Sequence, residues 1–225
     1  MSSDALTVAE EAHEAVRSAR NSVRTRQILR AAARLMARDG SDAVSMQALA
    51  DEASVSVGLI YRYFGNKQDL LHAVIAEVLD DLAARVPAAI EAAGADPVRR
   101  LAGGFRAYCE AIADHRHAAL LTYRESKALG VEASERLKKR ETATVLPLLH
   151  TVEQGVAEGV FAAGVHAELV ALDLVMLAHA WALKHWYFEA HYDLDTYIAR
   201  QTAIGLGALI VPERRADYPD LLDIR

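Results

Sequence analysis

The residues best suited to do chemistry lie in one segment, Ser45–Leu71, which reads SMQALADEASVSVGLIYRYFGNKQDLL. Hydroxyl, amide and basic side chains recur there beside Gly58, at spacings that fit two short helices joined by a turn. Such groups bind phosphate oxygens and base edges, and a glycine near the start of a helix lets the backbone approach a partner closely. The segment therefore predicts a surface that binds double-stranded nucleic acid.

Two serines indicate where these short helices begin. Ser45 and Ser56 are expected N-caps, because a serine hydroxyl accepts a hydrogen bond from a free amide in the first turn. Residues 53–55 would form the tight connection of a helix-turn-helix, whose second helix can lie in a major groove. A Gly-Asn pair at 65–66 ends that helix, and a long helix is expected to follow over 67–86.

Charge is distributed unevenly along the chain. Residues 15–38 contain seven arginines and no acidic residue, and residues 15–72 carry nine Arg or Lys against five Asp or Glu, a net of +4. Since the formal net charge of the chain is −6, the other residues sum to −10. A basic front on an acidic body indicates that only the front meets a polyanion, although a solvated arginine-rich helix would carry the same charges.

Apolar spacing predicts helices throughout and no sheet. Pro87 is expected to end the helix that precedes it, and Pro147 to kink or break another. The predicted fold class is all-α, with an N-terminal three-helix helix-turn-helix domain and a C-terminal helical domain for ligand binding and dimerisation, about nine helices in all. Besides those already given, helices are expected over 21–38, 97–113, 116–129, 132–158, 167–190 and 195–210. The expected divisions are a flexible segment 1–20, the helix-turn-helix domain 21–72, the effector and dimerisation domain 73–211 and a tail 212–225.

Other classes of protein find little support. The nine histidines show no spacing that places ligands on one helix face, and the single cysteine has no partner, so we expect no metal site and no cofactor. No nucleophile elbow, phosphate loop or dinucleotide motif indicates an enzyme. The most apolar run, 169–188, contains charged residues, and no secretion signal is visible at the start. These features predict a cytoplasmic protein.

The stretch VSVGLIYRYFGNKQDLL resembles the recognition-helix signature of the TetR family. In that family a basic first helix, a Ser/Thr-capped second helix, an S-x-G-x-[IL]-Y-x-[YH]-F third helix and a K-x-x-L-L fourth helix follow at these spacings. The match covers about residues 24–72, with Ser54 at a turn position that is often glycine in the family. The resemblance implies a dimeric transcription regulator, commonly a repressor, that leaves a pseudo-palindromic operator when a small effector binds.

The resemblance also implies roles for individual residues at the DNA. Ser45 and Gln47 would position the backbone, and Tyr63 with Lys67 would contact phosphates. The residues that would enter the groove are Val57, Gly58, Leu59 and Tyr61. The helical spacing adds Arg62 as a candidate for base edges or flanking phosphates. The predicted DNA-binding residues are Arg24, Arg26, Ser45, Gln47, Val57, Gly58, Leu59, Tyr61, Arg62, Tyr63 and Lys67.

For the body, residues 123–161 and the W-x4-WY pattern at 181–187 resemble a subgroup of the family with members that sense CoA thioesters. A small-molecule effector, including an acyl-CoA, is therefore expected, with the basic stretch 136–140 as a candidate for the CoA phosphates. The alternatives are core packing for the aromatic residues and a solvated face for the basic ones. The predicted ligand-binding residues are Tyr108, Tyr123, Trp181, His185 and Trp186.

A homodimer through the last two long helices is also implied by the family. The faces named for it are Val170, Leu174, Leu177 and Trp181 on one helix, and Ile198, Thr202, Gly205, Leu206 and Leu209 on the other. The same stripes could instead pack within one chain. Three other functions remain open: an architectural DNA-binding protein without an effector, a transcription activator of the same family, and a helical enzyme.

Overall fold

The computed structural model describes residues 22–125 and 130–223, so the predicted flexible segment 1–20 lies outside the described residues. Regular structure in this part of the chain is helical, apart from one isolated antiparallel bridge between Phe161 and Ile210. The chain divides into two compact units, Met1–Val74 (unit 1) and Ile75–Arg225 (unit 2). The all-α fold predicted from the sequence is confirmed.

Unit 1 contains a helix over residues 22–39, α2 (Met46–Glu52), α3 (Val57–Phe64) and the beginning of α4 (Lys67–Ala92). Serine caps start the two short helices as expected: the Ser45 hydroxyl accepts from the Ala48 amide at 3.1 Å, and the Ser56 hydroxyl accepts from the Leu59 amide at 3.2 Å. Beneath these helices lies an apolar core made of residues such as Ile28, Leu49, Ile60 and Leu70.

Helix α4 continues through Pro87 to Ala92, so the predicted end at Val86 is wrong. A proline inside a helix costs about 3 kcal/mol through a lost hydrogen bond and a clash. Val86 and Ile90, on either side of it, are both buried, and burial of a large aliphatic side chain stabilises by about 1.5–3 kcal/mol. Core packing on both flanks offsets the local cost.

The same explanation holds for α7 (Val131–Ala157), which runs through Pro147 without a break. Val145 and Leu148 are buried beside the proline, and Val152 is buried one turn further on. The break that the proline predicts is therefore absent, because the helix retains its apolar face against unit 2.

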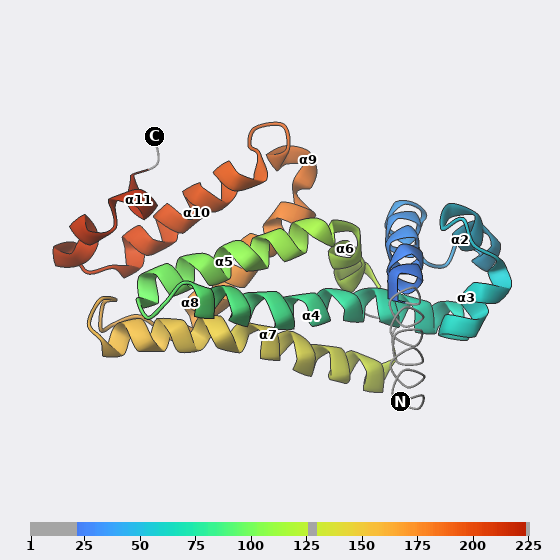
Figure 1. Ribbon diagram of the computed structural model, residues 1–225, viewed down its shortest axis with the longest axis horizontal. Coiled ribbons are helices and arrows are strands. Elements are labelled where there is room, and N and C mark those ends of the chain that lie inside the picture. The colour runs from blue at the N-terminus through green and yellow to red at the C-terminus, as the bar shows by residue number, and fades with distance from the viewer. Residues whose placement is uncertain (1–21, 126–129, 224–225) are drawn as a thin grey trace, which may run out of the picture. The chain divides into compact units, whose positions relative to one another are not determined.

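Unit 2 is a helical bundle built on α5 (Pro97–Asp114), α7 and α8 (Ala167–Leu183), which lie side by side (Figure 1). The predicted helix 167–190 is two helices, because Lys184 leaves helical geometry at φ −120° and ψ 27°. This change of direction lets Phe188 stack on Trp181, with ring centroids 6.1 Å apart. The other helices of unit 2 are α6 (Arg116–Arg124), α9 (His185–Phe188), α10 (Leu194–Leu209), the 3-10 helix η2 (Pro212–Asp217) and α11 (Pro219–Leu222).

The C-terminal segment is attached to the start of α5. Tyr218 is buried, and its hydroxyl donates to the Asp96 carboxylate at 3.0 Å. Asp96 is also the N-cap of α5, accepting from the Val98 amide at 2.8 Å. The Arg99 guanidinium binds both carboxylate oxygens of Asp220, at 2.9 and 3.2 Å. Residues 212–223 thus pack as part of unit 2.

Candidate functional site

The beginning of α3 is open to solvent, and Gly58 is its most informative residue. A methyl group added there would meet no heavy atom within 4 Å, so no contact within the chain requires a glycine. Glycine costs a helix up to about 1 kcal/mol relative to alanine, a cost that internal packing does not explain here. Close approach of an external partner to the α3 backbone does explain it.

The turn before α3 keeps its geometry although it has a serine where the family often has glycine. Ser54 has φ +52°, in the left-handed region, and the following Val55 amide donates to the Ala50 carbonyl at 2.9 Å. The Gln27 side chain donates to the Ala53 carbonyl at 2.8 Å and so fastens the turn to the helix over residues 22–39. Ser54 thus adopts by itself the left-handed conformation that glycine adopts readily.

Every predicted DNA-binding residue is at least partly exposed in unit 1. Buried Ile60 anchors α3 from beneath, while Tyr61 is 49% exposed and Arg62 lies fully on the outside. Arg24 and Arg26 are exposed on the helix over residues 22–39. The arrangement offers a serine-capped helix start, two aromatic hydroxyls and several guanidinium groups, which are the donors that phosphate and base recognition uses.

Lys67 has a structural role that the sequence did not reveal. Its ammonium donates to the carbonyls of Asp42 and Val44, each at 3.1 Å, and so ties the first turn of α4 to the loop before α2. An ammonium has three N–H donors, so one remains for a phosphate. Asn66 starts the same helix, accepting from the Asp69 amide at 2.9 Å.

In unit 2, two of the predicted ligand-binding residues meet through a third that the sequence did not single out. The Tyr123 hydroxyl of α6 hydrogen-bonds Nδ1 of His179 in α8, and the Tyr108 ring of α5 lies 5.9 Å from the His179 ring. Burial lowers the pKa of His179 to about 4, so the imidazole is neutral near pH 7. Residues from separate helices thus form a polar cluster in which Tyr108 and His179 are buried and Tyr123 is 41% exposed.

The other predicted ligand-binding residues lie elsewhere. Trp181 packs with His185, Phe188 and Tyr197, at centroid distances of 5.4, 6.1 and 5.2 Å. Trp186 is 70% exposed on α9. The five candidates therefore divide between the polar cluster around His179, an aromatic cluster where Trp181 of α8 meets Tyr197 of α10, and the surface.

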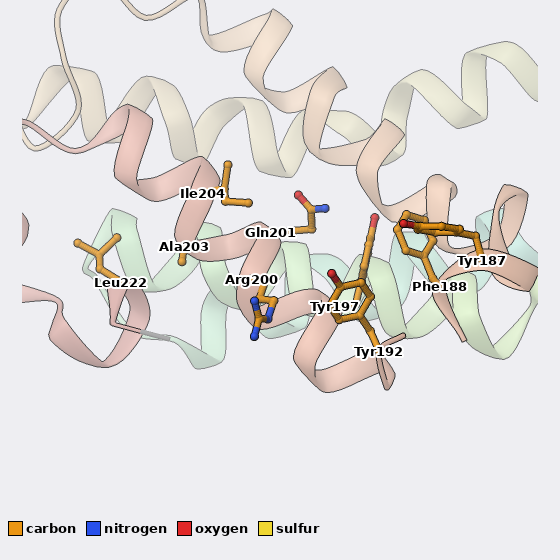
Figure 2. A pocket seen from close by; sticks show the side chains of 9 residues that line it. All are labelled: Tyr187, Phe188, Tyr192, Tyr197, Arg200, Gln201, Ala203, Ile204 and Leu222. Carbon is orange, nitrogen blue, oxygen red and sulfur yellow. The ribbon is translucent and has the colours of Figure 1, made fainter. Parts of the chain in front are cut away.

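A surface groove of about 440 Å³ lies beside α9 and α10 (Figure 2). The Arg200 guanidinium covers the Tyr192 ring there, 5.9 Å from its centroid, and Ile204 is exposed at the edge. None of the predicted ligand-binding residues lines this groove. Its lining is Tyr187, Phe188, Tyr192, Tyr197, Arg200, Gln201, Ala203, Ile204 and Leu222.

Comparison with known proteins shows the family. Residues 28–74 match the model of the bacterial regulatory proteins of the tetR family, and residues 94–190 match a tetracyclin repressor-like C-terminal domain. The HTH-type transcriptional regulator HbdR of Aromatoleum sp. (strain CIB) is 36% identical over 189 residues, which cover 84% of this chain and 80% of HbdR. The chain belongs to the TetR family. It is a DNA-binding regulator of transcription.

Solved structures of TetR-family proteins have the same fold. The ketosteroid transcriptional regulator KstR2 of Mycobacterium tuberculosis superposes with a TM-score of 0.71 at 25% identity, over 84% of this chain and 95% of that one. AibR, in complex with isovaleryl coenzyme A and operator DNA, gives a TM-score of 0.67 at 21% identity, over 80% of this chain and 97% of that one.

The faces named for a TetR-type dimer are mostly buried within the chain. Leu174 and Trp181 of α8, and Leu206 of α10, belong to the core of unit 2, as do Ile198, Thr202 and Leu209. Other apolar side chains are exposed on the same two helices. They are Leu169, Leu172 and Met176 on α8 and Ile204 on α10. Most of the residues named for the dimer therefore pack within one chain, which is the alternative given for them.

The basic stretch 136–140 of this TetR-family protein is largely occupied by ion pairs. Arg140 binds the Asp80 carboxylate and the Ala76 carbonyl of α4, and Lys138 binds Glu135 at 2.8 Å. Asp80 and Ala76 lie in the part of α4 that belongs to unit 2. Arg140 thus connects α7 to α4, whereas Arg136, Lys138 and Lys139 are exposed to solvent, as the alternative of a solvated face predicts.

Within residues 22–125 and 130–223, no three His, Cys, Asp or Glu side chains are arranged to hold a metal ion. No helix in the same ranges is long and apolar enough to cross a membrane.

Proposed function

We propose that this TetR-family regulator is a repressor that binds a pseudo-palindromic operator through α3 and releases it when an acyl-CoA-type effector binds in unit 2. The observation that carries the DNA-binding part is the exposed first turn of α3, in which Gly58 leaves open space beside a capped helix start. Backbone amides at such a helix start also attract phosphate oxygens. Val57, Leu59 and Tyr61 would then face the groove.

Flanking residues would hold the backbone of the duplex. Tyr63 and the remaining N–H of Lys67 would contact phosphates beside α3, and Arg24 or Arg26 would contact a phosphate further out. Each neutralised phosphate releases counterions, so operator affinity would fall steeply with salt. Cytoplasmic localisation follows from this proposed role.

We further propose that two copies associate through α8 and α10. Leu169 and Met176 are 60% and 51% exposed on α8, and Ile204 is 69% exposed on α10. Leu169, Leu172 and Met176 recur at the spacing of one helix face on α8, and exposed apolar side chains grouped on a face are typical of a protein interface. A two-fold dimer reads half-sites spaced by one helical turn, about 34 Å, or a multiple of it.

The effector class is supported by the relatives. AibR, which shares the fold, was solved with isovaleryl coenzyme A and operator DNA, and unit 2 of this chain provides polar groups inside an otherwise apolar bundle. Apolar sites with a few buried polar groups are typical of small-molecule binding. Arg140 holds the unit 2 part of α4, so an effector that disturbs this contact would move α4, which continues into unit 1.

The proposal is tested with a selected operator. Duplexes bound by the purified protein are enriched from a random pool, and affinity for the best one is measured by fluorescence anisotropy with and without a panel of acyl-CoAs. We expect a dissociation constant of about 10 nM or tighter at physiological salt, weakened at least about tenfold by an effector.

Different failures would point to different functions. Tight binding with no preference among duplexes would favour an architectural protein. Unchanged operator affinity across the whole panel would remove the acyl-CoA effector. A transcription assay that showed higher output with the regulator bound would make it an activator.

A further inference from the structure

A basic groove of about 440 Å³, which we call the arginine groove, lies within unit 1. Three arginines of the helix over residues 22–39 line it together with one carboxylate, so the groove carries a formal charge of +2. The arginines are four residues apart, and side chains at that spacing lie one above another on a helix, about 6 Å apart along its axis. The lining of the groove is Val23, Arg26, Gln27, Arg30, Ala31, Arg34, Glu52 and Ala53.

The three guanidinium groups differ in what they bind. Arg34 is paired with Glu52, whose Oε1 lies 3.1 Å from Nη2 of the guanidinium. Arg26 donates to the hydroxyl of Ser22 at 3.4 Å. Arg30 is exposed, and it has no hydrogen bond or ion pair with any residue that the structure describes. The positive charge of the groove is therefore concentrated at Arg26 and Arg30, where no carboxylate neutralises it.

The arginine groove is held next to the first turn of α3. Ala53 lines the groove, and its carbonyl accepts from the Gln27 side chain at 2.8 Å. Ser56, the N-cap of α3, follows only three residues later. A helix that lies in a major groove, about 12 Å wide, has a phosphate backbone on each side of it. The backbone on the side of Ala53 would therefore run past the arginine groove.

We infer that the arginine groove holds the phosphate backbone of the duplex beside the start of α3, with Arg30 as a phosphate contact. A guanidinium suits this role because it can donate two parallel hydrogen bonds to one phosphate. Glu52 limits the attraction, since it neutralises Arg34 at one end of the groove. Contacts of this kind fix the position of the duplex and read no bases. The inference rests on the proposed placement of α3 in the major groove.

The salt dependence of DNA binding distinguishes such a contact from a solvated arginine. Each phosphate contact adds about 0.9 to the slope of log affinity against log salt concentration, so Arg30→Gln should have a slope that is shallower by about 0.9. If the contact contributes nothing at 1 M salt, binding by Arg30→Gln should be weaker by about fifteenfold at 50 mM and about fourfold at 200 mM. Fluorescence anisotropy with the selected operator measures both quantities.

An unrelated duplex shows whether the contact reads bases. Arg30→Gln should weaken binding to that duplex by the same factor as binding to the operator, because a phosphate is present at every position of either sequence. A loss confined to the operator overturns the inference, since it would indicate base recognition.

Two other variants of unit 1 have different expected results. Glu52→Gln removes the negative charge and releases Arg34, so it should bind both duplexes more tightly and with a steeper salt slope. Arg38→Gln is the matched control, because Arg38 belongs to the same helix, does not line the groove and already binds the Asp39 carboxylate at 2.8 Å. It changes the net charge as Arg30→Gln does, and it should leave affinity and slope unchanged. Circular dichroism checks that each variant is folded.

The remaining outcomes separate the arginine groove from the role of α3. An unchanged salt slope in Arg30→Gln overturns the groove as a phosphate site, and so does an equal effect of Arg38→Gln or weaker binding by Glu52→Gln. Equal affinity of the parent protein for operator and unrelated duplex overturns the proposed operator reading by α3 instead. In that case the salt slopes of parent and Arg30→Gln still test the groove on either duplex.

Discussion

Replacement of Gly58 by alanine separates the stability of α3 from its use. Because the added methyl meets no atom within 4 Å, the folded chain accommodates it without strain. Alanine lowers the backbone entropy of the unfolded chain, and in a first turn we take the low end of the known range, a stabilisation of about 0.5 kcal/mol. For a chain of this size that corresponds to a Tm higher by about 1–2 °C.

The effect on the operator has the opposite sign. If the α3 backbone lies against DNA at this position, the methyl occupies space that the duplex needs, and overpacking of this kind costs about 1–3 kcal/mol. The dissociation constant should then rise by about 5- to 150-fold. Thermal denaturation followed by circular dichroism and anisotropy with the selected operator measure the two effects on one sample.

Gly164 provides the control. It belongs to unit 2, has open space for a methyl group and has no left-handed φ, so Gly164→Ala should leave operator affinity unchanged. Full operator affinity in Gly58→Ala would refute the idea that a duplex approaches the first turn of α3. A fall in Tm would refute the reading of this glycine as structurally unnecessary.

Three further changes test the fold and the assembly. Ser54→Gly should stabilise unit 1 by up to about 1 kcal/mol in urea unfolding, because it relieves a left-handed φ; loss of stability would contradict the turn. Gly155→Ala should destabilise by about 1–3 kcal/mol, because its methyl would lie 2.2 Å from the Phe161 ring, and an unchanged urea midpoint would contradict that packing. Met176→Glu should convert dimer to monomer in sedimentation analysis with helix content unchanged; a persistent dimer would place the interface elsewhere.

The stability of the protein should also depend on pH through His179. The pKa of His179 in the folded protein, about 4, is below the ordinary value of 6.5. The unfolded chain therefore takes up a proton first as the pH falls. The contribution of His179 to the free energy of unfolding is fully present above pH 6.5 and is lost as the pH falls towards 4, on the order of 3 kcal/mol in all. The difference between the urea midpoints at pH 7 and pH 4.5 should be smaller in His179→Gln than in the parent protein. An equal difference in both proteins would contradict the burial of a neutral imidazole.

Local signals explain why unit 1 could be predicted in detail. The caps at Ser45 and Ser56 and the left-handed Ser54 depend on residues within a few positions of one another, so the sequence alone contains the information. The exposure of α3 could be predicted as well, because an apolar residue anchors only one of its faces.

Longer-range packing explains what the sequence could not predict. Pro87 is a helix breaker by local rules, and only the burial of Val86 and Ile90 overrides it. His179 lies 56 positions from Tyr123, so no spacing rule connects them. The faces of α8 and α10 named for dimerisation are largely apolar. An apolar pattern does not tell whether another helix of the same chain or a second copy covers it.

The bond between Tyr218 and Asp96 has a practical consequence for engineering. Asp96 caps α5, so a truncation that removed Tyr218 would take away one of the hydrogen-bond donors that hold the Asp96 carboxylate, beside the Val98 amide. A biosensor that borrows this effector domain should therefore retain the chain at least to Leu222, with any reporter fused beyond it.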